Sequence, residues 1–440
     1  MHECFFALCF RLMGVQYMTS PFLIPLRYFS LVVLWSLLAT VNSVANAASD
    51  GDSALEYKLR YQVTLEPERE GASVLISVDK GELLKKIQFS NNHAIYSDIR
   101  GTGKLTLKDK RVTWELPSGN ARLTYFVKLT HERSPGKFDA RVTKEWALFR
   151  GDDLIPAIHT FEAPGAHAAA TLEFILPDSW KSVETGWPRK KGNIFKIDNP
   201  ERRFDRPVGW IIAGDIGSRR ASISKTAIAV SGPKGENFRR MDALVFFNFV
   251  WPEVAKAFGE TPEKLLVVGA ADPMWRGGLS ASNSLFLHSH RPLVSENGTS
   301  PLLHELTHMV TRITGVETDT ANDDWIAEGL AEFYSFELLY RADGMTKARR
   351  TRIIKGLEKW GAEVKHLRKS KSTGPVTARA VVLFDELDKE IKKRSNKKYD
   401  LDDVTRQLME KRKVSFDDLR AATEKLVGSD INALNSPLLK

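Results

Sequence analysis

The chain of 440 residues contains only two cysteines, Cys4 and Cys9, and none follows them. A fold held together by disulfide bonds is therefore excluded for nearly the whole chain. The sequence also lacks internal repeats and long low-complexity segments, which excludes solenoid and fibrous architectures. With 42% hydrophobic and 27% charged residues it has the balance of a folded globular protein, and its length allows two or three domains.

Long hydrophobic runs are scarce as well. The clearest is YFSLVVLWSLLATV, residues 28–41, which has the length of a signal-peptide core and is short for a membrane span. The small-x-small pattern that signal peptidase recognises ends at Ala47. We therefore expect residues 1–47 to be a signal peptide, with Met18 as an alternative start, and the mature protein to be exported to a bacterial periplasm or secreted. An uncleaved membrane anchor is the alternative.

Positive charge is unevenly distributed along the chain. The net charge is +9, and residues 346–440 alone hold 24 lysines and arginines against 14 acidic residues. Such a surplus fits contact with an anionic membrane face, a cell-envelope polymer or an acidic substrate. A solvated face of amphipathic helices is the simpler explanation, because the positive residues alternate with acids. Nucleic-acid binding is not expected, since export and the lack of a basic and aromatic stacking pattern argue against it.

Three regions of different pattern follow the leader. Residues 48–225 alternate apolar and polar side chains between turn residues, which predicts an N-terminal antiparallel β-domain. Residues 226–345 mix short β-rich runs with helical spacing, interrupted at Pro252, and this favours an α/β domain. Residues 346–440 have the pattern of a basic helical subdomain. The sequence thus predicts an α+β multidomain fold.

Two predicted helices in the α/β region carry the candidate site. The first is SPLLHELTHMVTRITG, with Ser300 as N-cap, a proline in its first turn and Gly315 at its end. The second is DDWIAEGLAEFYSFELLYRADG, which begins at Asp323 or Asp324 and closes at Gly344.

The first of these helices has the spacing of a zinc site. His304 and His308 are four residues apart, so both imidazoles lie on one helical face and can bind one ion. Glu305, next to the first histidine, is placed to act as a general base on a metal-bound water. A catalytic zinc needs a third protein ligand, and Glu328 on the second helix fits that role. Glu332, one turn later on the same face, is placed to accept the free N–H of a ligand histidine.

These two helices resemble those of the gluzincin metallopeptidases. The HELTH string at residues 304–308 and the WIAEGLAE string at residues 325–332 match that group's two zinc helices. Within the group the chain is most similar to the glycyl aminopeptidases, because further segments follow in that family's order: FRGDDLIPAI, LEFILPDSW, DRPVGW, GGLSASNS and VVLFDELDKEIKKRSNKKYDLDDVTRQL. The resemblance implies a thermolysin-like catalytic domain between a β-domain and a C-terminal helical subdomain, with Zn2+ as cofactor and a peptide or protein as substrate.

The chain departs from this family at two positions. The family has a glutamate after Gly-Gly-Leu, or in a related string, that holds the substrate's free amine, whereas this sequence reads Gly277, Gly278, Leu279, Ser280. These four residues and His288 are the predicted substrate-binding residues. The family also has an oxyanion-stabilising tyrosine before a helix start, where this sequence reads VTARA at residues 376–380. Loss of one oxyanion donor typically costs about a hundred- to a thousandfold in rate.

The sequence therefore leaves two hypotheses. The first is an exported zinc metallopeptidase that cleaves peptide bonds, either as an endopeptidase or with an aminopeptidase-like specificity. The second is an inactive relative that holds zinc and binds peptides or an envelope partner. If the enzyme is active, His288, His290 and Tyr334 are candidates to replace the missing oxyanion donor, although such residues more often pack or solvate.

Overall fold

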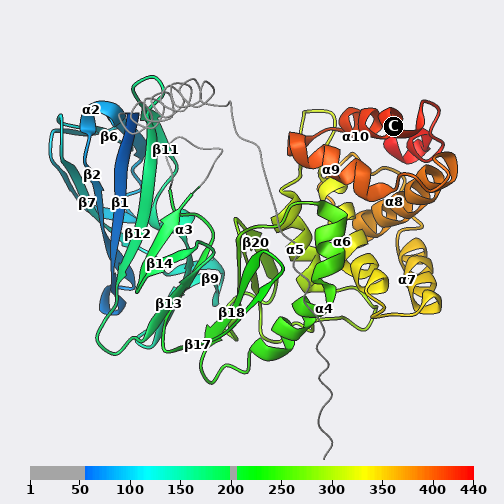
Figure 1. Ribbon diagram of the computed structural model, residues 1–440, viewed down its shortest axis with the longest axis horizontal. Coiled ribbons are helices and arrows are strands. Elements are labelled where there is room, and N and C mark those ends of the chain that lie inside the picture. Colours follow the sequence, from blue (N-terminus) through cyan, green and yellow to red (C-terminus); the bar gives the residue numbers. More distant parts are fainter. Residues whose placement is uncertain (1–54, 199–205) are drawn as a thin grey trace, which may run out of the picture. The chain divides into compact units, whose positions relative to one another are not determined.

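The computed structural model of the chain describes residues 55–198 and 206–440. The predicted signal peptide, its cleavage near Ala47 and the alternative start at Met18 lie outside the described residues. Strands occupy most of the first half of the described chain and helices most of the second (Figure 1). None of the helices in these two ranges has the length and apolar character needed to cross a bilayer.

Three sheets make up the N-terminal part of the described chain. The largest has seven strands in the order β14-β15-β12-β1-β2-β7-β4, a second has the order β13-β16-β10-β9-β8, and a third has the order β11-β3-β6-β5. Their bounds are β1 Glu56–Glu66, β2 Gly71–Val78, β3 Lys86–Ser90, β4 Tyr96–Gly101, β5 Lys104–Lys108, β6 Arg111–Glu115, β7 Ala121–Lys128, β8 His131–Ser134, β9 Lys137–Val142, β10 Trp146–Arg150, β11 Ile158–Phe161, β12 His167–Ile175, β13 Ser182–Thr185, β14 Arg189–Lys191, β15 Ile194–Ile197 and β16 Trp210–Gly214.

The alternation seen in the sequence sets the two faces of these strands. In β1, Tyr57, Leu59 and Tyr61 are buried while the residues between them are not. One pairing differs from the predicted antiparallel sheet, because β1 and β12 run parallel, with Tyr61 opposite Leu172. A parallel pair needs a long crossover, and the whole segment from β2 to β11 supplies it.

A fourth, mixed sheet of five strands supports the candidate site. Its order is β17-β18-β19-β21-β20, with β18, β19 and β21 parallel and with antiparallel strands at both edges. The bounds are β17 Ile216–Ile223, β18 Thr226–Pro233, β19 Lys264–Val268, β20 Gly278–Ala281 and β21 Ser284–Leu287. The boundary expected between residues 225 and 226 falls inside the β17–β18 hairpin, so this sheet begins at Ile216.

Helices follow and accompany this sheet. The longer ones are α4 Arg240–Phe258, α5 Pro301–Thr311, α6 Asp324–Arg341, α7 Lys347–Trp360, α8 Pro375–Arg394, α9 Leu401–Lys411 and α10 Phe416–Val427. Shorter elements are α2 Gly81–Leu84, α3 Gly151–Leu154, the strands β22 Thr314–Gly315 and β23 Lys413–Val414, and 3-10 turns at Pro67–Arg69, Ala433–Asn435 and Pro437–Leu439. Helix α5 contacts both α6 and the edge strand β20 (Figure 1).

The interruption predicted at Pro252 does not occur, because α4 runs through it. A proline inside a helix removes one hydrogen bond and costs about 3 kcal/mol. Phe247, Trp251 and Val254 are fully buried on both sides of Pro252, which is itself exposed. Packing of this buried face of α4 offsets the free energy that the proline costs the helix.

The ends of the two site helices also differ from the prediction. Ser300 is the N-cap of α5, as expected, and its hydroxyl accepts the N–H of Leu303 at 3.2 Å. The helix ends at Thr311, however, with Arg312 in the left-handed conformation at φ 54°. Gly315 lies beyond it in β22, where a Cβ would come within 2.3 Å of the Asp323 carbonyl carbon. Helix α6 ends at Arg341, before the predicted Gly344.

Candidate metal centre

Helix α5 presents two imidazoles on one face. The rings of His304 and His308 are 4.8 Å apart between centroids, and their Nε2 atoms are 3.2 Å apart. The face opposite them buries Leu302, Leu303 and Leu306, which fixes the rotation of the helix. The two histidines therefore face outward from the apolar core and toward each other.

Helix α6 adds a carboxylate to this pair. Glu328 lies 3.5 Å from Nε2 of His304 and 3.4 Å from Nε2 of His308. One ligand atom from each of the three side chains falls within 4.8 Å of the others, and within the described ranges no further group of three or more His, Cys, Asp or Glu side chains does so. Each of the three is partly exposed, so solvent and small molecules can reach the group.

The spacing of these atoms fits a tetrahedral zinc ion. Ligands about 2.1 Å from zinc in a tetrahedron lie about 3.4 Å from one another. The two Nε2 atoms are 3.2 Å apart, Nε2 of His308 lies 3.4 Å from Oε1 of Glu328, and Nε2 of His304 lies 3.5 Å from the other oxygen, Oε2. Two imidazoles and one carboxylate are also the donor set of zinc sites that keep a fourth position open.

Glu332 fixes the orientation of the first histidine. Its carboxylate lies 3.0 Å from Nδ1 of His304, which leaves Nε2 directed at Glu328 and His308. A carboxylate that accepts Nδ1–H selects the tautomer whose Nε2 lone pair can bind a metal.

The charges in the group perturb one another's pKa values. Burial lowers the pKa of His304, but hydrogen bonds with Glu328 and Glu332 outweigh it and raise that pKa to about 10. Burial raises the pKa of Glu328, but the two histidines more than reverse this and hold it well below its usual range. A site that binds protons this firmly between imidazoles and a carboxylate can exchange them for a divalent cation.

Glu305 lies between α5 and the edge strand β20. Burial raises the pKa of Glu305, although His304, His308 and the backbone N–H of Ser280 oppose the increase. A Cβ on Gly278 would come within 2.8 Å of the Glu305 side chain, so the strand can approach the glutamate only because this residue is glycine. Among the predicted substrate-binding residues Gly277, Gly278, Leu279 and Ser280, the last three belong to β20 and the first precedes it.

Close packing behind α6 sets the position of Glu328. Gly329 faces α8, where a Cβ would come within 2.7 Å of the Phe384 ring and 2.8 Å of Ala380. Trp325 stacks on the same Phe384 ring at 5.6 Å between centroids. Gly329 therefore allows α8 to pack directly against α6, next to the candidate ligand Glu328.

The three candidate oxyanion residues lie in different surroundings. Tyr334 is fully buried, and its hydroxyl donates to Asp402 at 2.8 Å, so it belongs to the interior between α6 and α9. His288 is also fully buried, and its Nδ1 accepts the backbone N–H of His290 at 3.2 Å. The ring of His290 is exposed. The structure does not bring any of these three into the His304, His308 and Glu328 group.

Sequence reasoning missed the role of Asp323. We expected it only as a cap, but its buried carboxylate accepts Nε of Arg368 at 2.7 Å and the N–H of Phe416 at 2.9 Å. These contacts fasten the start of α6 to the loop before α8 and to α10. The signal for them was weak, because the partners are 45 and 93 residues away in sequence.

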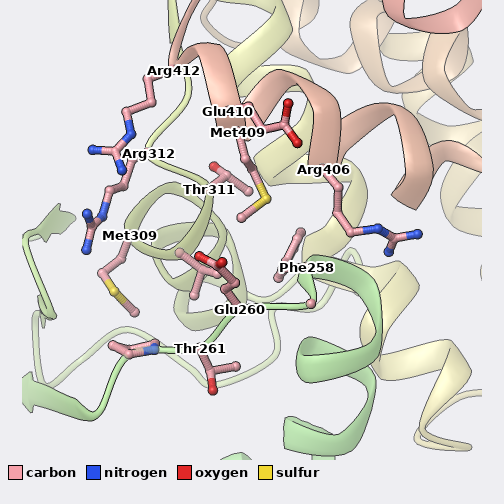
Figure 2. Close-up of a pocket in the computed structure, with 13 residues that line it drawn as sticks. Phe258, Glu260, Thr261, Met309, Thr311, Arg312, Arg406, Met409, Glu410 and Arg412 are labelled. Carbon is pink, nitrogen blue, oxygen red and sulfur yellow. The ribbon is translucent and has the colours of Figure 1, made fainter. Parts of the chain in front are cut away.

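A cavity of about 490 Å3 lies at the opposite end of α5 from its N-cap (Figure 2). Side chains from the ends of α4, α5 and α9 surround it, among them Phe258, Met309 and Met409. None of the three candidate zinc ligands lines it, although Met309 directly follows His308.

Comparison with solved structures identifies the fold. An aminopeptidase N family protein from Idiomarina loihiensis superimposes with a TM-score of 0.64 at 14% identity, over 87% of this chain and 76% of that one. An M1 zinc metallopeptidase mutant from Deinococcus radiodurans, bound to a Tyr-Ser-Ala substrate, gives 0.54 at 15% identity, over 87% and 93% of the two chains. A two-domain M1 zinc metallopeptidase mutant bound to L-tryptophan gives 0.53 at 16% identity, over 88% and 94%.

No protein-family model matches the chain, and no curated protein matches its sequence. At identities of 14 to 16% the structural likeness establishes the fold alone. The chain has a gluzincin aminopeptidase-like fold, with an N-terminal β-rich region and C-terminal helices, as its sequence predicts.

Proposed function

We propose that this chain, which shares its fold with M1 zinc metallopeptidases, is itself a zinc-dependent metallopeptidase of the gluzincin type. The observation that carries the proposal is the convergence of His304, His308 and Glu328, whose ligand atoms lie within 4.8 Å of one another and form the two-imidazole, one-carboxylate donor set of an open zinc site. Glu305 lies beside this group, with its carboxylate next to the edge strand β20.

The division of labour follows from where each side chain lies. A zinc ion held by the three ligands supplies Lewis acidity toward a scissile carbonyl and a water. Glu305 accepts the proton of the attacking water and later passes it to the leaving amine, and the raised pKa of this buried carboxylate strengthens it as a base. Glu332 keeps Nε2 of His304 turned toward the metal position.

The proposed substrates are peptides or proteins. Solved neighbours of the same fold are bound to a Tyr-Ser-Ala substrate and to L-tryptophan, which supports a peptide substrate here. Ser280 stands where the aminopeptidases resembled by this sequence carry an amine-binding glutamate. Both an endopeptidase and an aminopeptidase with a different amine contact are compatible with that residue.

We also propose that the protein acts after export. The proposal rests on the apolar run at residues 28–41 and the cleavage pattern that ends at Ala47. Expression of the full-length chain in a bacterial host, with N-terminal sequencing of the product from the periplasmic fraction, would locate the mature start near Ala48. An unprocessed chain in the membrane fraction would favour the anchor instead.

The decisive experiment pairs metal analysis with peptide cleavage. We expect the purified protein to hold one zinc per chain and to cleave peptides in a mixed library, read by mass spectrometry. Glu305→Gln should keep the zinc and lose at least about a hundredfold of the rate, since a general base typically contributes 10²- to 10⁴-fold. The positions of the cuts would separate aminopeptidase from endopeptidase action. Equal cleavage by both proteins would contradict the role given to Glu305.

One observation favours a second function. The oxyanion tyrosine of the resembled family is missing from residues 376–380, and the hydroxyl of Tyr334 is already bound to Asp402. An inactive protein that holds zinc and binds peptides or an envelope partner would be consistent with this. One zinc per chain with no cleavage by the wild type would establish that alternative.

A further inference from the structure

Helix α7 concentrates the positive charge of the C-terminal region. Its 14 residues, KARRTRIIKGLEKW, include six lysines and arginines and a single acid, Glu358. On α8, α9 and α10, by contrast, cations pair with acids of the same helix, as Lys392 does with Asp388 and Arg406 does with Asp403. Within the described ranges Arg350 is the one cation of α7 with an ion pair, so most of this charge is not used internally.

A groove runs along the same helix. A cavity of about 330 Å3 lies between α7 and the loop at residues 296–299, and Arg349, Arg352, Gly356 and Trp360 form its helical wall. These positions follow one another at helical spacing, so they lie on one face of α7. The Trp360 side chain is 54% exposed.

Gly356 keeps the floor of this groove open. A Cβ there would have no heavy atom within 4 Å. Glycine inside a helix is less stable than alanine by about 0.5–1 kcal/mol, so its presence here has a cost that internal packing does not explain. Open space over the glycine, between an exposed indole and two guanidinium groups, is suited to an extended ligand with an apolar part and a negative charge.

The opposite wall of the groove leads directly to the zinc helix. Gly298 packs on α7 so tightly that a Cβ would come within 2.5 Å of Cδ1 of Ile353. Thr299 lines the groove and is followed by Ser300, the N-cap of α5. With a rise of about 1.5 Å per residue, Thr299 lies roughly 7 Å along the helix axis from His304.

We propose that this groove is a subsite that binds an acidic side chain of the peptide substrate. The inference rests on the proposed peptidase function. Arg349 and Arg352 would bind the carboxylate, while the indole of Trp360 packs against apolar parts of the same peptide. An extended peptide rises about 3.3 Å per residue, so the acidic residue would lie about two to four residues from the bond that is cut. Glu296 lines the loop wall of the same groove, so a bound carboxylate would lie on the arginine side of it.

The shape of the site favours a peptide over a membrane surface. Helices that adsorb to membranes expose a continuous apolar face. On α7, Ile353 and Leu357 are buried, and Trp360 is its single large hydrophobic side chain with high exposure. A concave groove beside the zinc helix is the geometry of a side-chain subsite.

Binding can be measured apart from cleavage. The probes are fluorescein-labelled decapeptides of Ala, Ser and Leu in which one position in turn carries glutamate, together with matching glutamine peptides. Binding to the zinc-loaded Glu305→Gln protein is followed by fluorescence anisotropy. We expect a glutamate at one or two positions to tighten binding about tenfold over glutamine, and this gain to shrink at high salt.

Two double variants that remove the same number of positive charges from α7 are compared. The double variant Arg349→Gln, Arg352→Gln should lose the preference for glutamate, whereas Lys355→Gln, Lys359→Gln removes the same charge from α7 outside the groove and should retain it. Trp360→Ala should weaken glutamate and glutamine peptides alike, by about fivefold. Thermal unfolding of each variant would verify folding.

Either equal loss in both double variants or equal binding of glutamate and glutamine peptides would overturn the subsite. Binding to vesicles with 30% anionic lipid, without any discrimination among peptides, would overturn it in favour of a membrane contact. If the wild-type protein does not cleave peptides but still binds glutamate peptides preferentially through Arg349 and Arg352, the proposed catalysis is wrong and the acidic subsite stands. The two failures are therefore distinguishable.

Discussion

At the scale of single residues, the site depends on how His304 is held. Its Nδ1 lies 3.0 Å from Glu332 and its Nε2 lies 3.5 Å from Glu328, so the imidazole is fixed from both sides. Such a ring loses little rotational freedom when it binds a metal, because the acceptor has already chosen its tautomer and orientation. In the proposed site, Glu332 would therefore act on the metal through His304, without binding it directly.

We predict that Glu332→Gln binds zinc about 10- to 100-fold more weakly than the wild type. The amide is a weaker acceptor for Nδ1–H than a carboxylate, so the imidazole becomes less basic at Nε2. Competition with a chromophoric chelator at pH 7 would measure the change. Glu363→Gln, which removes the same charge from an exposed position on the loop after α7, is the matched control. Equal zinc affinity in both variants would contradict the positioning role.

At the scale of elements, the edge strand β20 sets the surroundings of Glu305, the proposed general base. The backbone of Ser280 donates to Glu305, and Gly278 leaves room for the side chain. The strand and the zinc helix are thus fitted to each other at two adjacent points. A larger side chain at Gly278 must displace either the strand or Glu305. Pairing with β21 holds the strand in place, so the Glu305 side chain is the one that moves.

We predict that Gly278→Ala lowers kcat/KM about a hundredfold while zinc content and thermal stability stay near those of the wild type. A methyl group would come within 2.9 Å of a Glu305 carboxylate oxygen, and a shift of about 1 Å in a catalytic group costs rate on that scale. Steady-state cleavage, zinc analysis and a melting curve on the same preparation would check it. A variant that unfolds, or one with full activity, would show that β20 does not set the position of Glu305 in this way.

The elements that could be predicted from sequence are those with local causes. The strand β1 and the start of α5 follow from alternation and from Ser300 as N-cap, which are properties of neighbouring residues. The parallel pairing of β1 with β12 and the link of Asp323 to Arg368 join distant residues, so no local pattern reports them. The helix break predicted at Pro252 was wrong for a related reason. Burial of the neighbouring side chains in the tertiary structure decides whether the helix continues through the proline.

The candidate zinc ligands and Glu305 likewise divide into residues with a local sequence signal and residues without one. The spacing of His304, Glu305 and His308 is local, and it predicts one face of one helix. That Glu328 reaches the same point depends on the packing of Gly329 against Phe384, which only the tertiary structure reveals. The proximity of Gly278 to Glu305 is likewise a contact between elements that the sequence does not indicate.

At the scale of the whole molecule, buried charge joins the β-rich region to the sheet that supports the site. Glu184 of β13 is 1% exposed and contacts Lys264 of β19 at 3.4 Å, Arg189 of β14 at 3.1 Å and Arg220 of β17 at 3.0 Å. One carboxylate thus lies among three cations drawn from two sheets other than its own. Close by, Trp210 of β16 packs on Phe286 of β21, so apolar contacts join the same two regions.

We predict that Glu184→Gln destabilises the protein by about 2–4 kcal/mol at pH 7. Without the carboxylate, the nearly buried Lys264 keeps a positive charge with little to balance it. Arg189 and Arg220 are more exposed, and water can solvate them, which limits the loss. Urea unfolding followed by tryptophan fluorescence would measure the difference, with Glu115→Gln in an exposed pair with Lys104 as the control.

The pH dependence of this difference identifies its cause. Burial raises the pKa of Glu184, but Lys264, Arg220 and Arg189 outweigh it and lower the pKa below its value in the unfolded chain. The carboxylate therefore stabilises the fold above about pH 4.5, and this contribution is lost as the pH falls through the lowered value in the folded protein. The difference in the free energy of unfolding between wild type and Glu184→Gln should consequently narrow below about pH 4.5. The small effect of Glu115→Gln on the same free energy should stay small at every pH. A gap that persists unchanged at acid pH would point to lost packing instead of lost charge at this junction.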